Sequence, residues 1–416
     1  MTTSRRSFLK SAGIVGAGLF LQDLYPSWMP RLAFAQNGAS GDVIVCVFLR
    51  GGADALNIVV PFGDDDYYRA RPTLSLAPPD SSNNSAVLEL TDFFGLNPDM
   101  AAMHELLTSG QMTAIHAVGA PHVSRSHFEA MDLIERGTDG SQGANTGWLG
   151  RYLSQTASDT DTPLRAIGWS DSLQTSLLGY IPATALRSIT DYHLASENAE
   201  SFQASMSQMY QSDDALTQAA QSTIDTLNLV QQIDVDNYIA ANNAQYYETN
   251  LGRALKQTAA LIKADAGLEV ACIDMGGFDT HIAQGNIVGT GIGEFPFLVK
   301  ELADNLRAFH DDLLNHIHKV TVVVMSEFGR RVQENGATGT DHGHGGVMFV
   351  MSSDLQPVTV HGQWLGINSR FLDNGDLAIT NDYRDVLSEI MLQRTTIGSV
   401  NNVFPNYRST PIGLYR

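Results

Sequence analysis

The sequence is poor in cysteine, in basic residues and in long apolar runs. Only two of its 416 residues are cysteines, too few for a disulfide scaffold or for a zinc module with four thiolates. The 25 Lys and Arg stand against 45 Asp and Glu, and the net charge of −20 argues against binding to nucleic acid or to anionic lipid. Charged residues interrupt every long apolar stretch after the N-terminus, which excludes a multi-span membrane protein. With 43% hydrophobic residues, the chain can still bury a large core.

The N-terminus has the order of regions found in an export signal. Arg5 and Arg6 are followed by a mildly apolar stretch, 11–21, and then by small residues at cleavage spacing, Ala33-Phe34-Ala35. The apolar stretch is shorter than the roughly 20 residues that span a bilayer, so we expect no stable membrane span. The pattern is similar to a twin-arginine signal over 1–35, although an ordinary basic N-terminus is an alternative. It implies export of the folded chain by the twin-arginine machinery to the periplasm, the cell envelope or the extracellular space.

The mature chain, which we expect to be one domain over 36–416, alternates buried-strand patterns with glycine-bearing turns. Apolar and β-branched runs predict strands over 41–49, 112–118, 268–273, 320–325 and 347–351, and helical spacing predicts a helix over 296–314. This rhythm predicts an α/β fold with a mainly parallel central sheet and flanking helices. Residues 196–266, rich in Ala, Gln, Asn and Ser, predict a helical insertion over one side of the sheet. Cys46 and Cys272 lie in two of the apolar runs and are expected to be buried thiols.

Side chains that bind metals follow the predicted strands. In parallel sheets the functional site lies beyond the carboxyl ends of the strands. There the sequence places acidic residues and histidines, namely Asp54, Asp279, His281, Glu327, Asp341, His342 and His344. Mixed carboxylate and imidazole ligands suit Zn, Mn, Fe or Ca rather than a site that demands thiolates. Because these residues share one edge of the predicted sheet, we favour a common metal site.

Several of these residues also have a purely structural interpretation. Asp54 could cap a helix that begins at the next residue. His281 could be a histidine that stabilises a turn, and Glu327 could form a salt bridge with Arg330 or with Arg331. The loop with two histidines and an aspartate is harder to explain by packing alone.

Ser126 is the first candidate for a nucleophile, with Ser124 as the second. A serine hydroxyl becomes nucleophilic only when a base or a metal activates it, and Ser126 precedes His127 near a predicted helix start. The alternative is a capping box, in which Ser126 is the N-cap and Glu129 lies three residues later. The capping box leaves His127 unexplained, so a catalytic role for His127 stays open.

Taken together, these segments resemble the domain-of-unknown-function 1501 family of exported bacterial proteins. The resemblance rests on Arg-Gly-Gly-Ala-Asp-Ala-Leu-Asn at 50–57, Arg-Ser-His-Phe at 125–128, Gly-Gly-Phe-Asp-Thr-His at 276–281, Ser-Glu-Phe-Gly-Arg at 326–330 and Gly-Thr-Asp-His-Gly-His-Gly at 339–345. That family looks like a branch of the alkaline phosphatase and sulfatase superfamily. The resemblance therefore implies an alkaline-phosphatase-like fold with two divalent metals and a Ser, Thr or Cys nucleophile, for which this chain offers Ser126 or Ser124.

The same resemblance implies a distribution of the ligands. One metal would be held by Asp54, Asp341 and His342, and the other by Asp279, His281 and His344. Either Glu327 or Asp341 fills the aspartate position of the superfamily, and both assignments stay open. Arg330 could bind an oxygen of the substrate, because its guanidinium is a fork-shaped donor, or could pair with Glu327.

The implied function is hydrolysis of a small anionic ester, either a phosphate or a sulfate. A second hypothesis is a metal-stabilised envelope or surface-binding protein that kept the fold and lost turnover. It arises because Ser126 stands closer to His127 than the nucleophile does in the similar stretch of phosphopentomutases. An oxidoreductase with a single redox metal is a third hypothesis.

Overall fold

The computed structural model describes most of the chain beyond residue 41. The described ranges are 42–122, 124–140, 144–157, 164–181, 183–191, 199–210, 215–233, 235–285 and 294–416. The predicted export signal, residues 1–35, lies outside them.

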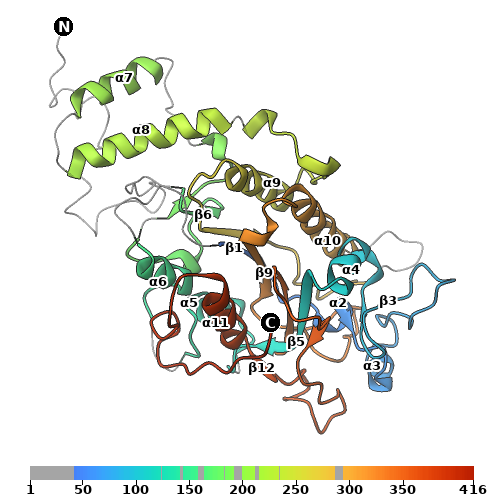
Figure 1. Cartoon of the computed structure of the whole chain (residues 1–416). Helices are drawn as coiled ribbons and strands as arrows, with labels where there is room; N and C mark the ends of the chain where they lie inside the picture. Colours follow the sequence, from blue (N-terminus) through green and yellow to red (C-terminus); the bar gives the residue numbers. More distant parts are fainter. Residues whose placement is uncertain are drawn as a thin grey trace.

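A nine-stranded sheet forms the centre of the molecule (Figure 1), in the order β11-β5-β10-β9-β1-β8-β6-β7 with β12 beside β5. Its strands are β1 (Val43–Leu49), β5 (Met112–Gly119), β6 (Ala166–Trp169), β7 (Thr184–Ala185), β8 (Val270–Met275), β9 (Val320–Ser326), β10 (Gly346–Met351), β11 (Val360–His361) and β12 (Asn381–Asp382). The described pairings are parallel except for those of β10 with β5 and β9. The predicted α/β fold with a mainly parallel sheet is confirmed. A small antiparallel sheet joins β2 (Val59–Val60), β4 (Gly95–Leu96) and β3 (Leu88–Glu89).

Helices flank the sheet on both faces. The α-helices are α2 (Ala55–Ile58), α3 (Asp65–Ala70), α4 (Ala101–Thr108), α5 (His127–Arg136), α6 (Trp148–Gln155), α7 (Ala199–Met209), α8 (Ala215–Ile233), α9 (Asn250–Lys263), α10 (Glu294–Asp312) and α11 (Tyr383–Arg394). Short 3-10 turns are η1 (Pro98–Met100), η2 (Thr175–Leu177), η3 (Ile189–Asp191), η4 (Val235–Asn237), η5 (Ala241–Asn243) and η6 (Ile317–Lys319). In the part of the chain that the structure describes, no helix is long and apolar enough to cross a membrane.

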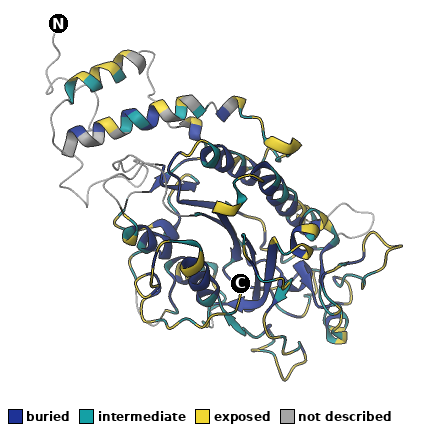
Figure 2. Ribbon diagram, in the orientation of Figure 1, coloured by how far each residue is buried: buried dark blue, intermediate teal, exposed yellow. Residues whose placement is uncertain are grey.

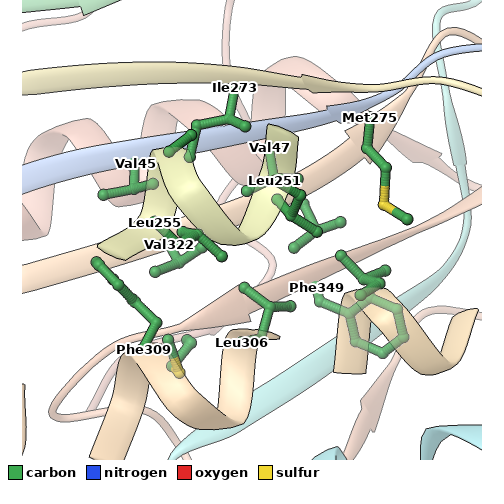
Figure 3. Close-up of a cluster of buried hydrophobic side chains, with 14 of the residues drawn as sticks. Val45, Val47, Leu251, Leu255, Ile273, Met275, Leu306, Phe309, Val322 and Phe349 are labelled. Atoms are coloured by element: carbon green, nitrogen blue, oxygen red, sulfur yellow. The ribbon is translucent and has the colours of Figure 1, made fainter. Parts of the chain in front are cut away.

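Strand β1 is buried on both faces because its side chains alternate between two layers of helices. Val45 and Val47 belong to the apolar cluster that includes α9 and α10, where Leu255 and Phe309 approach the sheet (Figure 3). Residues Ile44, Cys46 and Phe48 belong to the cluster on the other face, with α6 and α11. Figure 2 shows the resulting buried centre between exposed outer helix faces. A continuous apolar run is therefore the correct pattern for this strand.

The segment predicted as a helical insertion divides into two parts. Helix α9 lies on the sheet, and its Leu251 and Leu255 point toward β1 and β9 (Figure 3). Helices α7 and α8 lie away from the sheet (Figure 1), and Met206, Ala220 and Ile224 form a small apolar cluster between them. It is thus α9 that covers the sheet, as a regular part of the main core.

The two cysteines are buried and free. Cys46 and Cys272 are direct neighbours in the register of the parallel strands β1 and β8. Burial, followed by the proximity of Cys46, raises the pKa of the Cys272 thiol well above its usual value. The prediction of buried thiols is confirmed.

The strand directions place the ligand-type residues at one edge of the sheet. Strands β1, β5, β8 and β9 all end there, and each is followed by one of the polar segments. The antiparallel strand β10 begins at the same edge, so the loop before it, 339–345, also lies there. The candidate site is assembled at this edge.

Candidate metal centre

Three imidazoles and one carboxylate converge at this edge, and we call His127, Asp279, His281 and His342 the His/Asp cluster. The Nε2 atoms of His127 and His281 lie 3.0 and 2.9 Å from Nε2 of His342. Asp279 Oδ1 lies 3.0 Å from Nε2 of His342 and 3.0 Å from Nε2 of His281. His127 begins α5, whereas Asp279 and His281 follow β8. His342 precedes β10. The cluster therefore joins three segments that are distant in the sequence.

The opposite nitrogen of each imidazole has an acceptor of its own. These contacts join Nδ1 of His127 to Glu327 Oε1 (2.7 Å), Nδ1 of His281 to Asp341 Oδ1 (2.9 Å) and Nδ1 of His342 to the backbone carbonyl of Arg125 (2.8 Å). Carboxylates and carbonyls only accept hydrogen bonds, so each Nδ1 carries the proton. Each Nε2 is then left with a lone pair directed into the cluster. This is the arrangement by which proteins orient metal-binding histidines.

The residues of the His/Asp cluster fit a divalent cation. The Nε2 lone pair of His342 lies about 3 Å from those of His127 and His281 with no proton between them, and such lone pairs repel one another unless a positive charge lies among them. Ligands about 2.0–2.1 Å from a tetrahedral metal ion lie about 3.3 Å from each other, close to the separations observed. Nε2 of His127, a carboxylate oxygen of Asp279 and a ring nitrogen of His342 all lie within 4.8 Å of one another. His281 adjoins this group of three, with its Nε2 2.9 Å from Nε2 of His342 and 3.0 Å from Oδ1 of Asp279.

Asp279 is held in place by the guanidinium of Arg330. Arg330 is buried, and its Nη1 donates to Asp279 Oδ1 (2.9 Å) and to the carbonyl of Gly51 (3.3 Å). Nη2 and Nε of Arg330 donate to the carbonyl (2.5 Å) and the hydroxyl (3.2 Å) of Thr340. Burial works against ionisation of Asp279, but the hydrogen bond from Arg330 and the positive charge of its guanidinium outweigh it and lower the pKa of Asp279. Asp279 is therefore a carboxylate at neutral pH.

Glu327 and Asp341 contact two imidazoles of the His/Asp cluster at Nδ1, on the side opposite to the cluster. Glu327 is buried and accepts from the backbone N–H of Gly51 (2.8 Å) as well as from His127. Hydrogen bonds from His281 and then Asn335 lower the pKa of Asp341. Both carboxylates thus orient ligands and do not enter the cluster themselves.

Comparison with known proteins places the chain in a family. The family model described as "Protein of unknown function (DUF1501)" matches residues 42–391. The chain belongs to the DUF1501 family. Among curated proteins, none matches the DUF1501 chain.

Solved structures similar to the DUF1501 chain include members of the alkaline phosphatase superfamily. A protein of that superfamily from Vibrio parahaemolyticus is 11% identical with a TM-score of 0.35, and the match covers 81% of this chain and 66% of that one. The lipoteichoic acid synthase LtaP from Listeria monocytogenes is 8% identical with a TM-score of 0.37, covering 92% and 79%. The C-terminal periplasmic domain of EcEptC from Escherichia coli, in complex with Zn, is 11% identical with a TM-score of 0.29, covering 78% and 77%.

Asp54 is not part of the His/Asp cluster in the DUF1501 chain. Its side chain is 1% exposed and is bound by the fully buried Arg71, with contacts of 2.6 Å from Nη1 and 2.9 Å from Nη2. Gln284 Nε2 donates to the same carboxylate. Asp54 is the N-cap residue of α2, but its side chain makes no capping hydrogen bond. Nothing in the sequence pattern marks Arg71, which lies 17 residues further on, as its partner.

His344 also lies outside the cluster, although it is only two residues from His342. Its Nδ1 is 2.9 Å from Asp373 Oδ2, and its side chain is buried. It lines a small cavity, shared with His122, Ser124 and Glu327, that has room for a single water molecule. The structure therefore separates the two histidines that were expected to converge.

The two candidate serines lie at the start of α5, next to His127. Ser126 is the N-cap residue and is exposed, and its side chain makes no capping hydrogen bond. The Ser124 hydroxyl donates to Glu129 Oε2 (2.6 Å) and accepts from the backbone N–H of Ser126 (3.2 Å). The capping box, the alternative interpretation of Ser126, is therefore not formed, and Glu129 accepts a hydrogen bond from Ser124 instead.

Proposed function

We propose that this DUF1501 protein is an exported, metal-dependent hydrolase of phosphate or sulfate esters. The observation that carries the proposal is the convergence of three Nε2 lone pairs on one carboxylate, each imidazole being fixed from behind by an acceptor. Such a set has little use in packing, and it lies at the sheet edge where α/β enzymes place their active sites. The N-terminal sequence pattern supports export to the periplasm or cell envelope by the twin-arginine machinery.

The His/Asp cluster would hold one cation, with Zn, Mn or Fe favoured over Ca because imidazoles outnumber oxygen ligands. When bound, the cation would supply Lewis acidity and would lower the pKa of a coordinated hydroxyl or water. In the arrangement implied by the resemblance, Asp54 would hold one ion and His344 the other, but the structure pairs these two residues with Arg71 and Asp373. We therefore infer one ion at this centre.

The chain's own residues have distinct roles in this proposal. Ser126 is the first candidate for the nucleophile, because it adjoins a ligand and begins a helix whose N-terminal N–H groups favour an anionic ester. Arg330, whose donors are taken up by Asp279, Thr340 and Gly51, orients a ligand and does not bind substrate.

A second function, a metal-stabilised binding protein without turnover, is favoured by one observation. Within the described residues, neither candidate serine donates a hydrogen bond to the His/Asp cluster, and the Ser124 hydroxyl is taken up by Glu129. A serine nucleophile normally has a base or a metal within hydrogen-bonding reach, although such contacts often tighten only when substrate binds.

Metal analysis combined with an ester panel distinguishes the two functions. The purified mature protein is expected to hold about one cation per chain and to cleave aryl phosphate monoesters, diesters or sulfates, with turnover abolished in His342→Ala. Ser126→Ala is expected to lower kcat by more than about 100-fold without loss of the metal, and Ser124→Ala tests the second candidate nucleophile in the same way. Retention of the cation without turnover on any ester would identify the binding protein. Full activity in both serine variants would contradict the serine nucleophile alone.

A further inference from the structure

A buried chain of hydrogen bonds runs from Asp279 back to the Asp54–Arg71 pair. Arg330, which binds Asp279, donates from Nε to the hydroxyl of Thr340 (3.2 Å). The Thr340 hydroxyl donates to Gln284 Oε1 (2.5 Å), and Gln284 Nε2 donates to Asp54 Oδ2. Thr340 and Gln284 are fully buried. Asp54, although not in the His/Asp cluster, is therefore connected to it through two side chains and Arg330.

The hydrogen bonds between Arg330 and Asp54 all run in one direction, with each donor pointing toward Asp54. The exception at the other end is Arg330 Nη1, which donates to Asp279. Asp54 is a carboxylate and accepts only, so the Gln284 amide must turn its NH2 toward Asp54 and its oxygen toward Thr340. The proton of the Thr340 hydroxyl is then used on Gln284, which leaves a hydroxyl lone pair for Arg330 Nε–H. Each orientation thus follows from the previous one, and buried networks of this kind reinforce each other.

The far end of the chain is itself anchored. Besides binding Asp54, Arg71 donates to three acceptors, the carbonyl of Val332 (2.9 Å), the carbonyl of Arg331 (2.9 Å) and Asn57 Oδ1 (2.8 Å). A guanidinium with this many partners has no alternative rotamer. The Asp54 carboxylate is therefore a fixed starting point for the chain.

We propose that Gln284 and Thr340 are positioning residues of the metal centre, which hold Arg330 in the rotamer that presents Asp279 to the cation. The proposal rests on metal binding by the His/Asp cluster. Neither residue contacts the cluster through its side chain, so the effect on metal affinity is exerted through Arg330. A merely structural polar network would instead change the stability of the fold and leave the metal affinity of the folded protein unchanged.

Two isosteric variants separate these roles. Thr340→Val removes the hydroxyl between Arg330 and Gln284 and keeps the side-chain shape. Thr280→Val is the matched control, because the Thr280 hydroxyl donates to the same Gln284 Oε1 (2.9 Å), is similarly buried and has no contact with Arg330. Thr340→Ser restores the hydroxyl.

The measurement is the dissociation constant for Zn2+, by competition with a chromophoric chelator, together with the absorption spectrum of the Co2+-loaded protein. Thr340→Val is expected to weaken Zn2+ binding about tenfold, as changes behind metal ligands do, and to shift the Co2+ bands. Thr280→Val should stay within about twofold of the wild type, and Thr340→Ser should return to it. If Thr340→Val does not fold, Gln284→Met, which removes both polar atoms at similar length, is expected to show the same loss.

The outcomes distinguish this proposal from the proposed function. Equal Zn2+ affinities in Thr340→Val and Thr280→Val, with ester hydrolysis intact, would overturn the positioning role alone. The expected order of affinities without hydrolysis of any ester would overturn the hydrolase and support the positioning role. A wild-type protein that binds no cation would overturn both.

Discussion

The turns after β1 and β8 have the same pattern, Gly-Gly-x-Asp, at 51–54 and at 276–279. They follow neighbouring parallel strands, and each carries a carboxylate as the fourth residue of the pattern. Yet Asp54 is enclosed and neutralised by Arg71, whereas Asp279 is about half exposed and faces three imidazoles. The same local pattern therefore serves different functions, and the difference comes from residues that other segments contribute.

The two turns also depend on each other sterically. Gly51 has a φ of +118°, and a Cβ at this position would lie 2.4 Å from the backbone nitrogen of Asp279. A glycine in the first turn thus allows the second turn to approach and to present its aspartate. After Gly52 the first turn enters α2 at Ala55, whereas the second continues to His281 without regular secondary structure. The first aspartate is thereby directed into the protein and the second toward its surface.

Removal of Arg71 is expected to have the largest effect on this pair of turns. Arg71→Met leaves the Asp54 carboxylate buried without its cation, which should lower the free energy of unfolding by about 3–5 kcal/mol. Urea denaturation of the metal-free protein measures this loss. The control is Arg69→Met, because Arg69 pairs with Asp66 on the surface and should contribute less than about 1 kcal/mol. Similar losses of unfolding free energy in both variants would show that the buried Asp54 carboxylate does not depend on Arg71 for charge compensation.

Changing each aspartate to asparagine should separate affinity from stability. Asp279→Asn is expected to weaken Zn2+ binding by more than about 100-fold, because even changes behind the ligands cost about 10–100-fold. Asp54→Asn should instead mainly destabilise the metal-free fold, because it leaves Arg71 buried and uncompensated. Chelator competition and urea denaturation on both variants test the contrast. Equal losses of Zn2+ affinity in the two variants would instead support the two-metal arrangement, in which Asp54 is also a ligand.

Metal withdrawal should destabilise the protein through the His/Asp cluster only. A cation at 100 times its dissociation constant stabilises the folded state by about 2.7 kcal/mol, so a chelator should lower the Tm of the loaded wild type. His342→Ala should abolish this shift. His344→Ala should retain it, because His344 is bound to Asp373 and not to the cluster. Scanning calorimetry with and without chelator gives the result, and loss of the shift in both variants would contradict the separation of the two histidines.

The smallest expected effect concerns the carboxylates that orient imidazoles. Asp341→Asn weakens the acceptor on His281 Nδ1 and should reduce Zn2+ affinity by about tenfold at most, since Asp341 is largely exposed. Asp373→Asn makes the same change behind His344, at the same distance of 2.9 Å, and should leave the affinity unchanged. An equal loss in Asp373→Asn would show that His344 contributes to metal binding.

Much of the sheet is predictable from sequence because its central strands are buried on both faces. Continuous β-branched runs mark β1, β5, β8, β9 and β10 to within about two residues, and the helical apolar spacing marks α10. The antiparallel direction of β10 is not visible, since side chains alternate in the same way in either direction. The division of the helical segment at α9 depends on contacts with the sheet that its polar composition hides.

The site could be located from sequence but not resolved into roles. Strand ends share an edge, so Asp279, His281 and His342 were expected at the same edge, and the structure places them there. The assignment of His342 to a different ion from Asp279 and His281 was wrong, because His342 contacts both of them. The distinction between residues in the cluster and residues behind it, such as Glu327, depends on side-chain distances of a few ångströms that no spacing rule contains. Two contacts have no sequence signature. Arg71, the partner of Asp54, lies in another segment, and the acceptor for His342 is the backbone carbonyl of Arg125, which any residue could supply.

The separation of the ligands along the chain determines when an ion can be acquired. His127 and His342 are 215 positions apart, so no partial or unfolded chain presents all four donors. The metal ion must therefore bind after the chain has folded, in whichever compartment folding takes place. For a protein exported in the folded state, as we propose here, this would let the cytoplasm select the metal before transport, in a compartment whose metal availability differs from that outside.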